Sequence, residues 1–126
     1  SIATSLSKVI QVQGAKTSKC QLLAVSKTKP VGDILSAYDA GQRHFGENYI
    51  DEFVQKAAEL KESHPDIIWH FIGHIQSNKA KKLAQCLNLS IIETIDSQKL
   101  ADLINKECAK MEERKSAPPL DVLIQV

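Results

Sequence analysis

The sequence predicts an α/β protein built on a parallel sheet, and three observations support this fold class. Apolar, β-branched runs alternate with stretches whose apolar residues recur at helical spacing. The alternation repeats about every 25 residues, as it does in right-handed βαβ units. The apolar runs are nearly continuous, which is typical of strands covered on both faces. Two architectures fit this pattern: an open doubly wound sheet, and part of an eight-stranded barrel.

The N-terminal part of the chain predicts two helices and two strands. A helix is predicted over residues 2–13, where apolar side chains fall near helical spacing. A first strand is predicted over 21–27, a short apolar run that ends in polar residues. Pro30 suits the first turn of the next helix, which Gly41 is placed to end. Residues 43–45 follow as a short second strand.

The central part repeats the alternation. One apolar stripe predicts a helix over residues 50–60, which the breaker Ser63-His64-Pro65 closes. β-Branched and aromatic residues over 67–73 predict a third strand, in which Trp69 is expected to pack in the core. A further apolar stripe predicts the next helix over 80–87.

The C-terminal part predicts another strand and helix and then a last strand. The strand covers residues 89–95, and Asp96 or Ser97 can cap the helix after it. Residues 120–126 form an apolar fifth strand, at which the sequence stops. A barrel of this kind has about 250 residues. We therefore expect one domain over residues 1–126 that contains about the first five strands of a barrel and is truncated at its C-terminus.

Composition and charge exclude several classes of protein. The 16 Lys and Arg residues are balanced by 15 Asp and Glu residues, whereas general nucleic-acid binders usually carry a large basic excess. The aromatic share of 5% argues against stacking platforms. No apolar run approaches the roughly 20 residues of a membrane-spanning helix. We expect a protein that binds neither nucleic acid nor membrane.

Cysteine usage predicts a reducing compartment. Cys20, Cys86 and Cys108 are odd in number, widely spaced and free of any C-x-x-C pair, so they indicate neither a disulfide framework nor a zinc site. The expected location is the cytoplasm. A mitochondrial fraction stays open as well, because the sequence begins at Ser1 rather than Met and a transit peptide could precede it.

The working face of a parallel α/β fold lies at the carboxyl ends of its strands, and Lys27 stands at such an end. Leu23, Val25 and Lys27 share one strand face by the period of two, so the amine would continue a buried row into the site. A neutral amine there would be a nucleophile for a carbonyl group and would form a Schiff base. The plainer alternative is a rim position with a solvated ammonium. Spacing alone favours that alternative, and Lys29 is a weaker candidate.

Other polar residues have plainer interpretations. His70 and His74 are four apart, which on a helix would suggest metal ligands, but they fall in a predicted strand and the loop after it, so we expect no metal site. Lys79, Lys81 and Lys82 predict a solvated basic face, with the steering of an anionic ligand as the lesser alternative. No G-x-G-x-x-G or Walker-type glycine loop is present, which argues against dinucleotide and P-loop nucleotide sites.

Four motifs carry a family resemblance, and they are longer and more specific than any single spacing. They are AVSKTKP at residues 24–30, FGENY at 45–49, WHFIGHIQSNK at 69–79 and ETIDS at 93–97. In this order they closely resemble the pyridoxal phosphate homeostasis protein family, which is similar to the barrel domain of alanine racemase without its second domain. The resemblance runs from about Leu22 to Val126.

The resemblance implies a (β/α)₈ TIM barrel that binds pyridoxal 5′-phosphate (PLP), with Lys27 as the lysine that holds the cofactor as an aldimine. It therefore reverses the preference from spacing alone. Asn48 and His70 match positions expected to line the same strand ends and to contact the cofactor. Barrel phosphate sites usually form from the loops after strands seven and eight, so the phosphate-binding residues are expected outside this sequence.

The resemblance implies a carrier rather than an enzyme. Its expected role is intracellular vitamin B6 homeostasis, with effects on amino-acid and keto-acid balance and with PLP-dependent apoenzymes as recipients. Lys27 would release the cofactor to another amine by transimination. One alternative is a racemase-like enzyme, although the opposing acid or base of alanine racemase comes from the second domain that this family lacks. Another is an interaction module in which Lys27 is idle.

Overall fold

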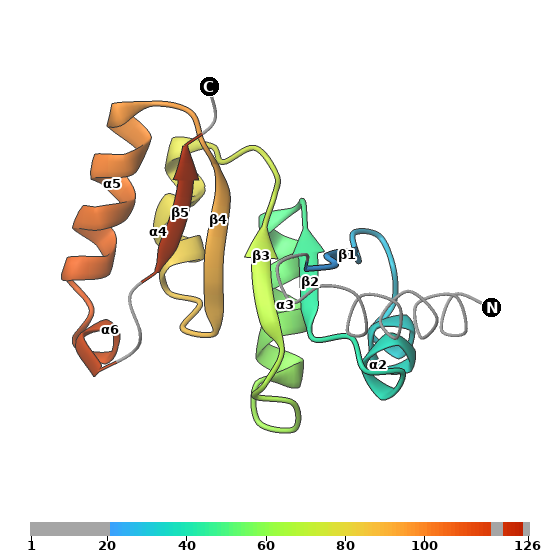
Figure 1. The fold of residues 1–126 in the computed structure, drawn as a ribbon. Coiled ribbons are helices and arrows are strands. Elements are labelled where there is room, and N and C mark those ends of the chain that lie inside the picture. The colour runs from blue at the N-terminus through green and yellow to red at the C-terminus, as the bar shows by residue number, and fades with distance from the viewer. Residues whose placement is uncertain (1–20, 117–119, 125–126) are drawn as a thin grey trace.

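The chain folds into an open parallel sheet with its helices packed against the strands (Figure 1). The computed structural model describes residues 21–116 and 120–124. The helix predicted over residues 2–13 and the last two residues of the predicted fifth strand lie outside the described residues. None of the helices within the described ranges has the length and apolarity that crossing a bilayer requires.

Five strands form the sheet, and all neighbouring pairs are parallel. They are β1 (Ala24–Val25), β2 (His44–Glu47), β3 (Ile68–Phe71), β4 (Leu89–Ile95) and β5 (Asp121–Ile124). Their order in the sheet is their order in the sequence. A doubly wound sheet reverses its strand order at a switch point, and the described strands show no such reversal. The order is that of a barrel segment, yet the five strands do not close into a barrel.

The helices lie between the strands in sequence, as the alternation predicts. They are α2 (Val31–Asp39), α3 (Ile50–Leu60), α4 (Ala80–Ala84), α5 (Gln98–Ala109) and α6 (Glu112–Ser116), with a 3₁₀ turn, η1 (Ser77–Lys79), before α4. Two predicted helix ends are confirmed. The Ser97 hydroxyl accepts from the Leu100 amide at 3.1 Å and caps α5, and Gly41, at φ 108°, follows α2 in a backbone conformation that suits glycine.

The first strand is much shorter than predicted. The apolar run over 21–27 suggested seven strand residues, but only Ala24 and Val25 pair with β2. After one more ladder bond, from the Ser26 amide to the Gly46 carbonyl at 2.9 Å, the chain turns away, and Thr28 has a φ of 60°. The loop that carries Lys27 therefore has little support from strand pairing, because an edge strand of two residues provides few ladder bonds.

The hydrophobic core lies between the sheet and the helices. Phe45, Trp69 and Phe71 alternate with residues of the opposite sheet face, and all three are almost fully buried. Phe53 of α3 packs on this row, with ring centroids 5.5 Å from Trp69 and 6.1 Å from Phe71. Trp69 is thus a core residue, as predicted. The residues that alternate with these three, such as Gly46, lie on the opposite face of the sheet.

Replacing Phe53 with alanine removes the ring that packs α3 against two aromatic side chains of β3. We expect Phe53→Ala to lower the free energy of unfolding by about 3–5 kcal/mol, because a buried aromatic side chain is lost and a cavity remains. Urea denaturation followed by circular dichroism measures this change. Gln55→Ala, at an exposed position of the same helix, is the control and is expected to stay within about 0.5 kcal/mol. Similar values for the two variants would contradict this account of the core.

Candidate functional site

The loops at the carboxyl ends of the first three strands meet at one edge of the sheet. The Ile72 amide donates to the Glu47 carbonyl at 2.9 Å, which extends the pairing of β2 and β3 by one residue. A Cβ on Gly73 would lie only 1.9 Å from the Asn48 carbonyl oxygen, so the two loops touch and only glycine fits there. The Thr94 hydroxyl donates to the Gly73 carbonyl at 2.5 Å and ties the end of β4 to the same edge.

Lys27 lies in the turn directly after β1, and its side chain is exposed. The turn is closed by a bond from the Lys29 amide to the Ser26 carbonyl at 3.1 Å. Ser26 itself is buried. The structure thus places an accessible primary amine at the carboxyl edge of the sheet. It lies in a turn that backbone hydrogen bonds of Ser26 and Lys29 hold in place.

A buried ion pair lies beneath this turn. Glu47, at the end of β2, is fully buried, and its Oε1 lies 2.7 Å from Nζ of Lys56 on α3. Burial raises the pKa of the Glu47 carboxyl above its ordinary value, while hydrogen bonds from Lys56 and Ser26 oppose the rise. The second Glu47 oxygen accepts from the Ser26 hydroxyl at 2.9 Å.

Lys56 is a site residue that the sequence patterns alone did not predict. The signal was present, because Lys56 falls on the helix stripe that includes Phe53 and Leu60, which are buried. The ammonium of a lysine on such a stripe either reaches solvent or is buried among charged partners. The spacing of residues cannot distinguish these two cases. Its partners on β2 and in the turn after β1 are far away in the sequence.

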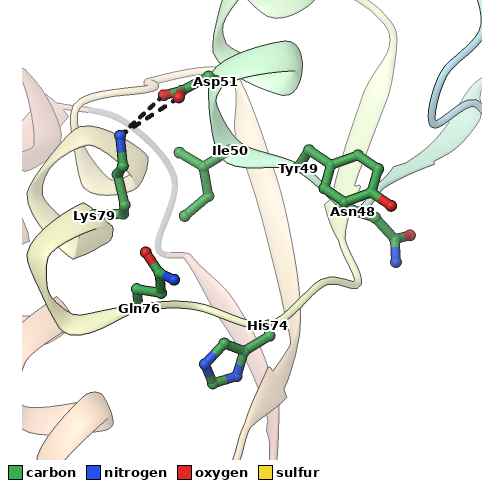
Figure 2. A pocket seen from close by; sticks show the side chains of 7 residues that line it. All are labelled: Asn48, Tyr49, Ile50, Asp51, His74, Gln76 and Lys79. Atoms are coloured by element: carbon green, nitrogen blue, oxygen red, sulfur yellow. Dashed lines mark hydrogen bonds and ion pairs between the residues drawn. The ribbon is translucent and has the colours of Figure 1, made fainter.

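Asn48 follows Glu47 and has a buried oxygen. Its Oδ1 is shielded from solvent and lacks a hydrogen-bond partner among the described residues. Buried polar atoms are usually paired, so an unpaired acceptor at a strand end can accept from a bound group. Asn48 borders a cavity of about 480 Å³ (Figure 2). The other lining residues are Tyr49, Ile50, Asp51, His74, Gln76 and Lys79.

His70 occupies the centre of a chain of polar side chains on the sheet face opposite the helices. Its Nδ1 lies 2.9 Å from Oε1 of Glu93 on β4, and its Nε2 lies 2.9 Å from Nδ1 of His44 on β2. A carboxylate can only accept, so His70 donates through Nδ1; in the neutral ring Nε2 then accepts from His44. Both ring nitrogens of His70 are therefore engaged inside the protein.

The two histidines that are four apart in sequence lie in different places. His70 is buried in β3, whereas His74 is exposed and lines the cavity of Figure 2. Among residues 21–116 and 120–124, no group of three or more His, Cys, Asp or Glu side chains is arranged to hold a metal ion.

Two members of the predicted basic cluster pair with one carboxylate. Lys82 Nζ lies 2.6 Å and Lys79 Nζ lies 3.4 Å from Asp51 Oδ1, and Figure 2 draws the Lys79 contacts. The hydrogen bond from Lys82, together with the charges of both lysines, lowers the pKa of Asp51. All three side chains are substantially exposed, so each pair contributes little to stability.

The described cysteines are free thiols. Cys86 is buried, and burial raises its pKa to about 11, so it stays protonated at neutral pH. Cys108 is partly buried. Cys20 lies outside the described residues. Cys86 and Cys108 are thus not joined to each other by a disulfide.

Comparison with known proteins identifies the family. The family described as "Alanine racemase, N-terminal domain" matches residues 5–126 of the chain. The chain belongs to this family. The similarity to the barrel domain of alanine racemase that the four motifs imply is therefore confirmed.

Curated proteins that share the name pyridoxal phosphate homeostasis protein are similar to this chain in sequence. The chain is 47% identical over 108 residues to the pyridoxal phosphate homeostasis protein of Mus musculus, covering 84% of the chain and 38% of that protein. It is 50% identical over 115 residues to the protein of the same name from Vibrio alginolyticus, covering 90% of the chain and 46% of that protein. The chain thus spans less than half the length of these relatives.

A solved structure with a similar sequence has the same fold. PipY from Synechococcus elongatus, determined with PLP bound, is 37% identical to the chain and superposes with a TM-score of 0.71. The match covers 83% of this chain and 49% of PipY. The open sheet described here therefore corresponds to about half of that protein.

A lowered pKa of His44 is expected to make the stability of the fold depend on pH. Burial, followed by the nearby His70, lowers the pKa of His44 below its ordinary value of 6.5. The unfolded chain then binds more protons at His44 than the folded protein does. The stability contributed by neutral His44 is present above about pH 6.5 and is lost as the pH falls through the lowered value.

We therefore expect the unmodified protein to lose more free energy of unfolding than His44→Gln when the pH is lowered from about 7.5 to about 5.5. Urea denaturation at both pH values measures the two losses. Glutamine keeps a side chain that can donate to His70 but does not titrate. Equal losses in the two proteins would show that His44 does not carry this dependence.

Proposed function

We propose that this chain belongs to a protein that carries PLP on Lys27 and takes part in intracellular vitamin B6 homeostasis. The observation that carries the proposal is the position of Lys27: an exposed primary amine in a held turn at the carboxyl edge of a parallel sheet. Ligands of α/β folds bind at this edge. The names of the relatives and the PLP in the PipY structure support the choice of cofactor.

Residues at the same carboxyl edge of the sheet fit such a cofactor. The amine supplies the nucleophile that an aldehyde requires. The buried Asn48 Oδ1 supplies an unused acceptor. Leu23 and Ile72 pack over Gly46, where a Cβ would lie 3.3 and 3.2 Å from their side chains, and form an apolar floor at the end of β2. An amine, a free acceptor and an apolar surface are the groups that hold an aromatic aldehyde.

Lys27 would attack the aldehyde carbon, form a C=N bond and release water. A second primary amine would then attack this carbon, take over the C=N bond and return Lys27 as a free amine. Both steps conserve electrons, so no oxidant or reductant is needed. In this proposal PLP-dependent apoenzymes receive the cofactor, which links the protein to amino-acid and keto-acid balance.

We also propose that the sheet is the first part of a (β/α)₈ barrel. Five parallel strands in sequential order, with a helix between neighbours, are the repeating unit of that fold. The exposed Val122, Leu123 and Ile124 of β5 fit a strand that continues a sheet.

Chemical trapping tests the proposed function. After incubation with PLP, borohydride reduction converts a C=N bond to a stable amine, and peptide mass spectrometry locates the adduct. We expect the adduct on the peptide that carries Lys27, its loss in Lys27→Ala, and no change at Lys27 in Lys29→Ala, which removes a neighbouring amine of the same loop. Adducts scattered over exposed lysines would contradict the proposal.

A second measurement separates carrier from enzyme. A racemase removes the α-hydrogen of an amino acid, so incubation with PLP and an amino acid in deuterium oxide would exchange that hydrogen. We expect no exchange above that of free PLP. Exchange that depends on Lys27 would identify an enzyme instead of a carrier.

A further inference from the structure

The turn that carries Lys27 is fixed by side chains rather than by strand pairing. Because β1 has only two residues, the backbone beyond it makes a single ladder bond, from the Ser26 amide to Gly46. The φ of 60° at Thr28 is a left-handed conformation that is unfavourable for a residue with a Cβ. Such a conformation persists only where its surroundings hold it.

Lys56 joins three segments at this point. Its Nζ donates to the Ser26 carbonyl at 2.8 Å and to Glu52 Oε1 at 2.7 Å, and it lies 2.7 Å from Glu47 Oε1. An ammonium has three donors, and here three acceptors surround it. The acceptors come from the turn after β1, from the end of β2 and from α3 itself.

The two carboxylates also hold the turn directly. Glu47 Oε2 accepts from the Ser26 hydroxyl at 2.9 Å, and Glu52 Oε1 accepts from the Thr28 amide at 2.6 Å. These contacts attach the residue before Lys27 and the residue after it, while the Lys27 side chain stays exposed. Both neighbours of the reactive lysine are thus tied to one charged cluster.

Stability alone does not explain such a cluster. Replacing a buried ion pair with apolar side chains of similar size is often neutral or stabilising, because burying two charges is costly. Because such a pair need not add stability, a network that contacts both neighbours of one exposed amine is suited to a positional role.

We propose that Glu47, Glu52 and Lys56 are positioning residues for Lys27. They set the backbone on both sides of it, so that its amine meets the aldehyde of a bound cofactor in a reactive arrangement. This inference rests on the proposed function and assigns to these side chains the control of its rate. Misplacing a reacting group by about 1 Å can slow a reaction 100-fold.

The test is a double variant, Glu47→Leu with Lys56→Met, which removes both buried charges together and leaves neither unpaired. Glu52→Ala is a second variant, which removes only the bond to Thr28 and one partner of Lys56. Lys61→Met, an exposed lysine at the end of α3, is the control. Urea denaturation confirms that each variant is folded before its chemistry is measured.

The first measurement is the rate at which the visible absorbance of the C=N bond appears over a range of PLP concentrations. The second is the fraction of borohydride adduct at Lys27. The third is amide hydrogen exchange over residues 26–28. We expect the double variant to fold, to exchange these amides faster, and to react at least about tenfold more slowly at saturating PLP, with little change in the concentration that gives half the maximal rate. Glu52→Ala should show the same effects to a smaller extent, and Lys61→Met should show none.

The outcomes separate the two proposals. If the unmodified protein forms no adduct at Lys27, the proposed function is wrong and the inference is overturned with it. If the unmodified protein reacts at Lys27 and the folded double variant reacts equally fast, only the positioning role is overturned. A slower reaction with unchanged amide exchange would also overturn it, because the effect would not act through the turn.

Discussion

The candidate site depends on one buried ammonium. Lys56 places a positive charge beneath the edge of the sheet, where it is only 6% exposed. A charge at this depth is tolerated only while its donors have partners. Its partners lie in the turn after β1, at the end of β2 and on α3. These segments therefore stabilise one another's positions. If the turn moved away, the Lys56 ammonium would lose a hydrogen-bond partner or become exposed to solvent.

The parallel direction of the strands brings the residues of the candidate site together. Because β1, β2 and β3 all end at the same edge, the turn with Lys27, the buried oxygen of Asn48 and the loop at Gly73 come together there. The aromatic core packs α3 against the sheet and thereby fixes the position of Lys56 relative to the strand ends. In the proposed reaction, this arrangement would hold the exposed amine of Lys27 ready for attack.

Local sequence patterns predicted the helices and strands well. They did not predict contacts between residues that are far apart in the sequence. Ser97 as a cap and Trp69 as a core residue follow from short stretches of sequence. The length of β1 did not, because an apolar run does not show how many of its residues find a partner strand. The network of Lys56 and the engagement of both ring nitrogens of His70 join residues from different strands and helices, which no spacing along the chain reveals. The family motifs, in contrast, pointed to Lys27 against the preference from spacing alone.

A crystal structure of the protein with PLP would show whether Lys27 is the attachment point and whether the buried cluster holds its turn. We expect continuous electron density from Lys27 Nζ to the aldehyde carbon, with Lys56 still hydrogen-bonded to the Ser26 carbonyl and to Glu52 and paired with Glu47. PLP bound without a link to Lys27, for example in the cavity beside His74 and Lys79, would contradict it.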